Sequence, residues 1–250
     1  MFMKKRIIGA ALIIFGLYLI PAVSAGETAH WGYSGHEGPE HWGELDPKFF
    51  LCSKGKNQSP VNLTEMIESD LPPIKINYKS GGNEILNNGH TIQVNYDPGS
   101  TIIVDGNEFE LKQFHFHSPS ENTIEGHAYP MEAHFVHADK DGRLAVIAVM
   151  FKYGEKNTEL EKAWAHIPNN AGEKRPLSKH VDANILLPHD HDYFRFNGSL
   201  TTPPCSEGVL WIVMKYFHTT SKQQIDTFTQ IMHHPNNRPV QPVNARAILK

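Results

Sequence analysis

Alternating apolar and polar residues mark several short strands along the chain, because successive side chains of a strand point to opposite faces. Alternation or β-branching covers four segments: 91–95, 101–104, 111–117 and, less cleanly, 132–136. Two further runs, 144–151 and 209–214, are continuously apolar, which is typical of strands buried on both faces. We therefore expect a large sheet with these two runs in its middle.

Turn and helix signals complete the pattern. Turn sequences follow three of these segments: Asp97-Pro98-Gly99, Asp105-Gly106-Asn107 and Asp141-Gly142-Arg143. Ser221 and Gln224 form a potential capping box before apolar residues at helical spacing, and a second short helix is expected over 158–165. The prediction is a β-dominated α+β domain, built on a large, mixed but mostly antiparallel twisted sheet with short peripheral helices and long loops.

The first 25 residues have the pattern of an export signal. Three basic residues at 4–6 precede an apolar run at 7–20, and a small-residue site ends at Ala25. That run is too short to cross a bilayer comfortably, which favours cleavage over anchoring. We expect a cleaved signal peptide at 1–25 and one domain at 26–250, located in the periplasm or secreted, without membrane attachment.

The net charge indicates which partners are not expected, and the cysteines bear on the cellular compartment. Removing the three basic residues of the signal changes the formal net charge from −4 to −7, and no Lys/Arg cluster remains, so nucleic acid is not an expected partner. Both cysteines, Cys52 and Cys205, lie in the exported part, where disulfides persist. We expect them to pair; the alternative is two free buried thiols.

Three histidines in two strand-like segments are the strongest chemical signal. His115 and His117 leave the same face of one strand, and His134 of a neighbouring strand could complete a three-nitrogen zinc site with an open fourth position. Gln113 and Glu132 each precede a histidine by two residues, so each can reach the second nitrogen of an imidazole and fix its tautomer.

The chain contains 16 histidines, so other interpretations stay open. A His-x-His pair can also be two half-buried strand residues bonded to backbone. His137 is at odd spacing from His134 and should face the opposite way. Four further histidines lie in loop-like sequence, where nothing supplies a buried second shell: His189, His191, His233 and His234.

Several motifs, in order, resemble the alpha class of carbonic anhydrases over essentially all of the mature chain. Besides the two histidine segments, the motifs are His30-Trp31-Gly32-Tyr33, Gly38-Pro39-Glu40-His41-Trp42, Asn57-Gln58-Ser59-Pro60, Asn88-Gly89-His90, Ser199-Leu200-Thr201-Thr202-Pro203-Pro204 and Asn237-Arg238-Pro239-Val240-Gln241-Pro242. The resemblance implies an enzyme that hydrates carbon dioxide reversibly to bicarbonate and a proton through zinc-bound hydroxide. Zn²⁺ is the implied cofactor.

The resemblance also implies roles for individual residues. The zinc ligands would be His115, His117 and His134, with Gln113 and Glu132 as their second-shell partners. Thr201 and Glu121 resemble the pair that orients the zinc-bound group, and His90 resembles the proton shuttle. The solvent network would be lined by Tyr33, Asn88 and Gln93. The substrate pocket would be formed by Val136, Val146, Leu200, Thr202, Val209 and Trp211.

Each of these roles has a plain structural alternative. Glu121 could cap a turn after Pro119, Thr201 could belong to an ordinary loop, and Asn88-Gly89 could be a hairpin turn. Three positions depart from the animal enzymes of the family: Ser118 and Asn122 replace a tryptophan and a histidine, and Thr91 is bulkier than the usual alanine. The β-branched side chain of Thr91 could restrict the motion of the His90 ring.

The resemblance further implies inhibition by sulfonamides and inorganic anions, and a homodimer as in other exported bacterial members. Two competing functions remain. One is a catalytically silent binding module on the same fold, and the other is a zinc-dependent esterase. Retention of all three histidines argues against the first, and the lack of a dedicated acyl pocket in the sequence argues against the second.

Overall fold

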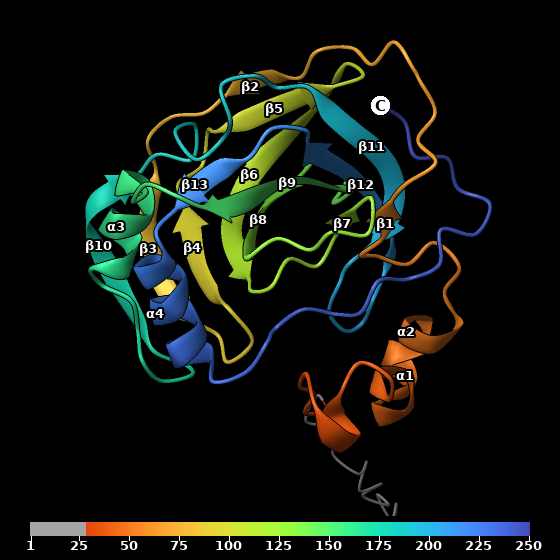
Figure 1. Cartoon of the computed structure of the whole chain (residues 1–250), viewed down its shortest axis with the longest axis horizontal. Helices are drawn as coiled ribbons and strands as arrows, with labels where there is room; N and C mark the ends of the chain where they lie inside the picture. Colours follow the sequence, from red (N-terminus) through yellow and green to blue (C-terminus); the bar gives the residue numbers. More distant parts are fainter. Residues whose placement is uncertain (1–28) are drawn as a thin grey trace, which may run out of the picture.

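A computed structural model describes residues 29–250, so the expected signal peptide lies outside the described residues. Its main feature is an 11-stranded sheet with the central order β10-β3-β4-β6-β8-β9-β12-β11 (Figure 1). Its strands are β2 (Lys75–Asn77), β3 (Gly82–Asn87), β4 (Ile92–Tyr96), β5 (Thr101–Val104), β6 (Asn107–His117), β8 (Met131–Ala138), β9 (Leu144–Tyr153), β10 (Lys174–Val181), β11 (Tyr193–Ser199), β12 (Glu207–Met214) and β13 (His218–Thr220). The strands β1 (Asn62–Leu63) and β7 (Thr123–Ile124) form a separate two-stranded sheet.

Most strand pairs are antiparallel, but β12 and β13 both pair with β9 in parallel, so the sheet is mixed as expected. All six expected strands are present, as β4, β5, β6, β8, β9 and β12. The strands that the pattern did not predict include β10 at one end of the sheet. Six of its eight residues are exposed, so this edge strand needs no regular apolar alternation.

The two continuously apolar runs form β9 and β12, and alternate residues of each strand enter different cores. In β12, Ile212 and Met214 belong to the larger core, whereas Trp211 and Val213 belong to a second core on the other face. Their position is only partly as expected. β9 is internal, but β12 is next to the last strand β11. β12 is still apolar on both faces, because segments such as Val61 to Leu63 belong to the core on its second face.

Strand β6 separates apolar from polar side chains across the sheet. Phe114 and Phe116 are fully buried in the larger core, and the intervening His115 therefore leaves the other face. His115 is in register with His134 of β8, which brings the three histidines onto one face of neighbouring strands. The alternation seen in the sequence thus positions the candidate site directly.

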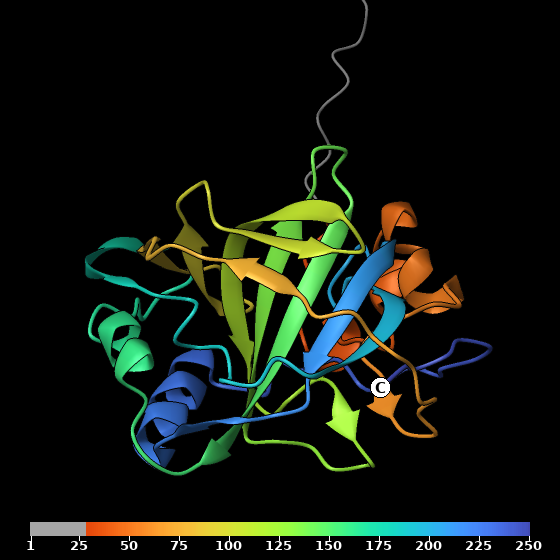
Figure 2. The ribbon, with the colours of Figure 1, turned by 90° about the horizontal axis from the view of Figure 1, so that it is seen from above.

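The helices are short and peripheral, as Figure 2 shows: α1 (Trp42–Leu45), α2 (Leu51–Lys54), α3 (Thr158–Trp164) and α4 (Lys222–Met232), with 3₁₀ turns at Gly35–Glu37 and Pro47–Phe49. The expected capping box is present, since Ser221 accepts from the N–H of Gln224 and the Gln224 side chain accepts from the N–H of Ser221. Phe228 of α4 packs against Trp164 of α3, and Trp164 packs against Phe116. The helix pair therefore supports the back of the histidine strand.

The N-terminal helices are joined to the sheet by a disulfide between Cys52 of α2 and Cys205, which confirms the expected pairing. Cys205 follows β11 and lies four residues after Thr201. Within residues 29–250, no helix is long and apolar enough to span a membrane.

Candidate metal centre

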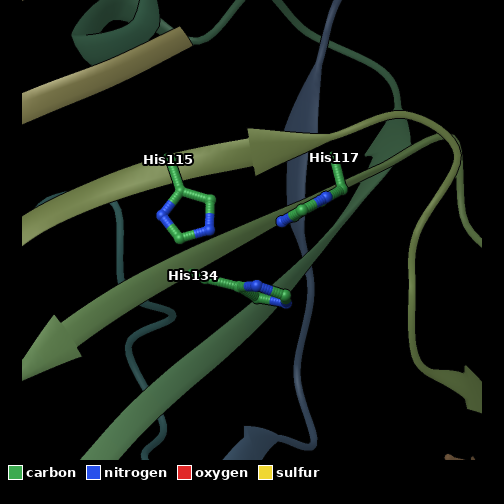
Figure 3. A group of neighbouring side chains, drawn as sticks. All are labelled: His115, His117 and His134. Carbon is green, nitrogen blue, oxygen red and sulfur yellow. The ribbon is translucent and has the colours of Figure 1, made fainter. Parts of the chain in front are cut away.

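The side chains of His115 and His117 from β6 and of His134 from β8 point into one shared space (Figure 3). One nitrogen from each imidazole can be chosen such that all three lie within 4.8 Å of one another. His117 and His134 are buried, with about 1% of their surface exposed. The geometry matches the three-ligand arrangement that the spacing predicts, with nitrogen donors that suit zinc.

The remaining nitrogen of each ring lies against a polar group, with hydrogen-bond geometry for His115 and His117 and at contact distance for His134. Nδ1 of His115 lies 2.9 Å from Oε1 of Gln113, and Nε2 of His134 lies 2.9 Å from Oε1 of Glu132. Nδ1 of His117 donates to the carbonyl oxygen of Asn236 over 2.7 Å. Sequence reasoning missed Asn236, because any residue type can present a backbone carbonyl.

These contacts test whether a metal would fit. Since each ring has one nitrogen beside a polar group outside the cluster, the other is left with a lone pair toward the common centre. Nε2 of His117 is buried without a hydrogen-bond partner among residues 29–250. Burial lowers the pKa of all three histidines, and the other imidazoles lower those of His115 and His134 further. Neutral, convergent imidazoles fit a divalent cation.

Glu121 lies beside the same centre and is 1% exposed. Its Oε2 is 3.5 Å from Nε2 of His117, and its Oε1 accepts from the backbone N–H of Arg238 over 2.8 Å. Burial raises the pKa of Glu121, whereas the N–H of Arg238 and the hydroxyl of Thr201 oppose this rise. Oε2 of Glu121 makes no hydrogen bond of ordinary geometry within the described chain.

Glu132 is fixed by the turn that carries Glu121. Its Oε2 accepts the N–H groups of Glu121 and Asn122, and its Oε1 accepts from the side-chain amide of Asn122 over 2.7 Å. Asn122 in turn accepts the N–H of Val61. Asn122 stands where the animal enzymes have a histidine. It gives the fully buried carboxylate of Glu132 one hydrogen bond from its backbone N–H and one from its side-chain amide.

A cavity of about 170 Å³ opens above the histidines. Among the residues of the expected solvent network, Tyr33, Asn88 and Gln93 all line it, together with His90 and Thr202. The hydroxyl of Tyr33 is buried and has no partner among the described residues. Asn88 also forms the expected turn, accepting the N–H of His90 over 2.9 Å.

His90 has a neighbour that sequence reasoning did not assign. The Trp31 ring stacks on the His90 imidazole, with centroids 3.6 Å apart and planes 7° apart. Thr91 is anchored to the back of β6, because its hydroxyl donates to the carbonyl of Phe116 over 2.5 Å. Thr91 therefore ties the segment that carries His90 to strand β6.

The side chains of the expected substrate pocket gather in the smaller core, on the histidine face. Val146, Val209 and Trp211 are buried there, and Val136 and Leu200 are partly buried. The Trp211 ring lies 4.9 Å from that of His134, and its indole N–H donates to the carbonyl of Ser199 over 3.0 Å. An apolar wall therefore reaches the metal centre.

Of the competing histidines, His137 and His191 lie away from this centre. His137 is fully buried on the opposite face, where Nε2 lies 2.5 Å from the hydroxyl of Tyr78 and Nδ1 lies 3.1 Å from the carbonyl oxygen of Ala145. His191 lines a different cavity. A larger cleft of about 600 Å³ is lined by charged residues such as Glu108 and Lys140 and contains no histidine, so the chemistry belongs to the smaller cavity.

A mixed sheet that presents three convergent imidazoles beside an apolar wall fits the class of proteins that hold a metal ion on a sheet face. The family model for eukaryotic-type carbonic anhydrases matches residues 37–250. A carbonic anhydrase of Pectobacterium carotovorum is 48% identical over 228 residues, covering 91% of this chain and 93% of that protein. The chain belongs to the eukaryotic-type, or alpha, carbonic anhydrase family and is an enzyme of that family.

Solved structures agree with this assignment. The alpha-carbonic anhydrase of Thermovibrio ammonificans, in complex with the inhibitor sulfanilamide, superposes with a TM-score of 0.88 at 51% identity, covering 90% of this chain and 100% of that one. A hyperthermostable carbonic anhydrase from a hydrothermal vent chimney gives 0.87 at 58% identity, covering 88% and 99%. The fold expected from the sequence is that of the family.

Proposed function

We propose that this enzyme hydrates carbon dioxide reversibly to bicarbonate and a proton, with Zn²⁺ held by His115, His117 and His134. The observation that carries the proposal is the set of three convergent nitrogens, each on a ring whose other nitrogen lies against a polar group. Zinc bound there would supply a Lewis acid that makes a bound water acidic near neutral pH. The family assignment supports the same reaction.

The chain's own residues would orient the reacting groups. Arg238 occupies Oε1 of Glu121, which leaves Oε2 facing the histidines as an acceptor for the hydroxyl proton of Thr201. When Thr201 donates to Glu121, its oxygen can only accept a second hydrogen bond. Thr201 would then select a group that donates and would fix the direction of that group's lone pairs.

Carbon dioxide is small and apolar, and the site offers matching surroundings. The wall formed by Val136, Val146, Leu200, Val209 and Trp211 is apolar and adjoins His134. Thr202 lines the cavity on its polar side. We assign these residues to substrate binding, and Tyr33, Asn88 and Gln93 to the water chain along which a proton would leave toward His90.

The test is a stopped-flow measurement of carbon dioxide hydration with a pH indicator. Zinc-loaded protein should accelerate hydration, and removal of zinc by a chelator should abolish the acceleration until zinc is restored. Absence of chelator-sensitive hydration in zinc-replete protein would contradict the proposal.

The two competing functions gain no support from the geometry. A silent binding module is disfavoured because all three ligand nitrogens are present and oriented. A dedicated esterase is disfavoured because the cavity of about 170 Å³ is smaller than the roughly 300–1,000 Å³ of typical ligand sites. Ester hydrolysis would then be a side reaction of the same centre.

We also propose a cellular location, a set of inhibitors and an oligomeric state for this protein, based on its sequence and its relatives. We assign residues 1–25 to a cleaved signal peptide and 26–250 to the carbonic anhydrase domain, placed in the periplasm or secreted. N-terminal sequencing of the exported protein should begin at Gly26. Sulfonamides and inorganic anions should inhibit at the metal centre, and a homodimer can be checked by light scattering.

A further inference from the structure

A second imidazole, that of His234, lies at the rim of the candidate site. It follows α4, is exposed, and its ring centroid is 5.9 Å from that of Tyr33, which lines the cavity. Two residues later, the side-chain amide of Asn236 donates to the carbonyl oxygen of His90 over 3.0 Å. One short segment therefore holds His234 and His90 near the same opening.

The hydrogen bonding of His234 leaves one nitrogen ready to accept a proton. Nδ1 lies 3.0 Å from the carbonyl oxygen of Pro235, and since a carbonyl only accepts, Nδ1 carries the hydrogen. Within residues 29–250, no hydrogen bond involves Nε2 of His234.

His90 is constrained as a proton acceptor. It is stacked on Trp31, and burial lowers its pKa to about 4, with further lowering by His30 and His234. An imidazole with that pKa holds a proton only weakly at neutral pH. The charges of His90 and His234 also oppose each other, so a proton on one disfavours a proton on the other.

We propose that Nε2 of His234 is a second proton-accepting group of this site, acting in parallel with His90. A proton released into the cavity water would form the Nε2–H bond of an imidazolium, and loss of a proton from either ring nitrogen to a buffer base would restore the neutral ring. Exposure of the ring gives buffer direct access to it. The inference rests on the proposed hydration of carbon dioxide.

Oxygen-18 exchange between carbon dioxide and water separates the two steps. It reports the interconversion of carbon dioxide and bicarbonate, and independently the release of labelled water, which requires proton delivery. In weak buffer, His234→Gln should slow water release about twofold or more, with interconversion unchanged. His90→Ala combined with His234→Gln should slow water release at least about tenfold. His191→Gln, in a separate cavity, is the matched control.

A double variant that releases water as fast as His90→Ala alone would overturn the inference, while leaving the proposed function in place. Absence of catalysed interconversion in the zinc-loaded parent would instead remove the proposed function and this inference with it. A readout independent of activity is nitrogen-15 NMR of the imidazoles. Neutral His234 should carry its hydrogen on Nδ1 in metal-free and zinc-loaded protein, and a hydrogen on Nε2 would contradict the proposal.

Discussion

At the scale of single residues, the second nitrogen of each candidate ligand decides whether the ring can bind a metal. Glu132 has the most elaborate setting, because two backbone N–H groups and the Asn122 amide hold it against His134. A buried carboxylate that touches a ligand ring raises the basicity of that ring and fixes its tautomer. Zinc affinity should therefore depend on the charge of Glu132.

Glu132→Gln keeps the shape of the side chain but removes the charge, and we expect it to weaken zinc binding about 10- to 100-fold. The measurement is competition for zinc with a chelator of known affinity. Glu159→Gln is a matched control, since Glu159 is also buried but pairs with Lys162 on α3. An unchanged zinc dissociation constant would show that Glu132 has a purely structural role.

At the scale of elements, the site depends on β6 being supported from behind. Phe116 lies between two ligand histidines in sequence and packs on Trp164 of α3 and Phe228 of α4. The capping box fixes the start of α4 and also reaches α3, because the Gln224 side chain accepts from the N–H of Asn157 over 2.9 Å. Local sequence at Ser221 thus contributes to the stability of the whole layer.

Ser221→Ala should reduce the free energy of unfolding by about 1 kcal/mol, because the first turn of α4 loses its side-chain acceptor. Urea denaturation monitored by fluorescence measures the effect. Thr227→Ala serves as control, since its hydroxyl only donates back to the Gln223 carbonyl within the helix, and it should change stability by less than about 0.5 kcal/mol. Equal effects of both variants would rule out a special role for the cap.

At the scale of the whole molecule, the disulfide and a buried histidine control stability under different conditions. Cys52 and Cys205 are 153 residues apart, so their bond constrains most of the unfolded chain. His137 lies far from solvent, between Tyr78 and the carbonyl of Ala145. Reductant should therefore change stability through the disulfide, and acid should change it through His137.

Reduction of the disulfide should lower the free energy of unfolding by about 2–4 kcal/mol, because the unfolded chain regains its freedom. Urea midpoints with and without a phosphine reductant measure the change. In a variant with Cys52→Ser and Cys205→Ser, the reductant should have no effect. If complete reduction leaves the urea midpoint of the wild type unchanged, this expectation is contradicted.

Acid should weaken the fold through His137. Burial lowers its pKa to about 4, and the carbonyl of Ala145 opposes this only partly, whereas in the unfolded chain the pKa is about 6.5. Between these values the unfolded state binds the extra proton, so stability should fall by about 3 kcal/mol as pH drops from about 6.5 to 4, and level off below.

Urea denaturation across pH 3.5–7 tests this dependence, in which the difference between wild type and His137→Gln isolates the contribution of His137. The variant should be less stable at neutral pH, where the bond to Tyr78 is lost, but should have a flatter slope in acid. His180→Gln, at an exposed position, should follow the wild type. Parallel curves for wild type and His137→Gln would refute the assignment.

Much of the fold could be predicted because periodicity is a local property. The segment 111–117 alternates, and that alone places Phe114 and Phe116 in the core and His115 and His117 on the other face. The edge strand β10 could not be found this way. An exposed edge strand needs no apolar face, and its pairing with β3 is a long-range contact.

The sequence by itself determined which residues carry chemistry: the three histidines, their partners Gln113 and Glu132, and the apolar runs that surround them. Only the tertiary structure decided the acceptor of His117, the stacking of Trp31 on His90 and the approach of His234 to Tyr33. The physical reason is the separation in sequence between the residues that interact. Side-chain direction along a strand follows from neighbouring residues, whereas a carbonyl or ring that is distant in sequence arrives only when the sheet and its loops have packed.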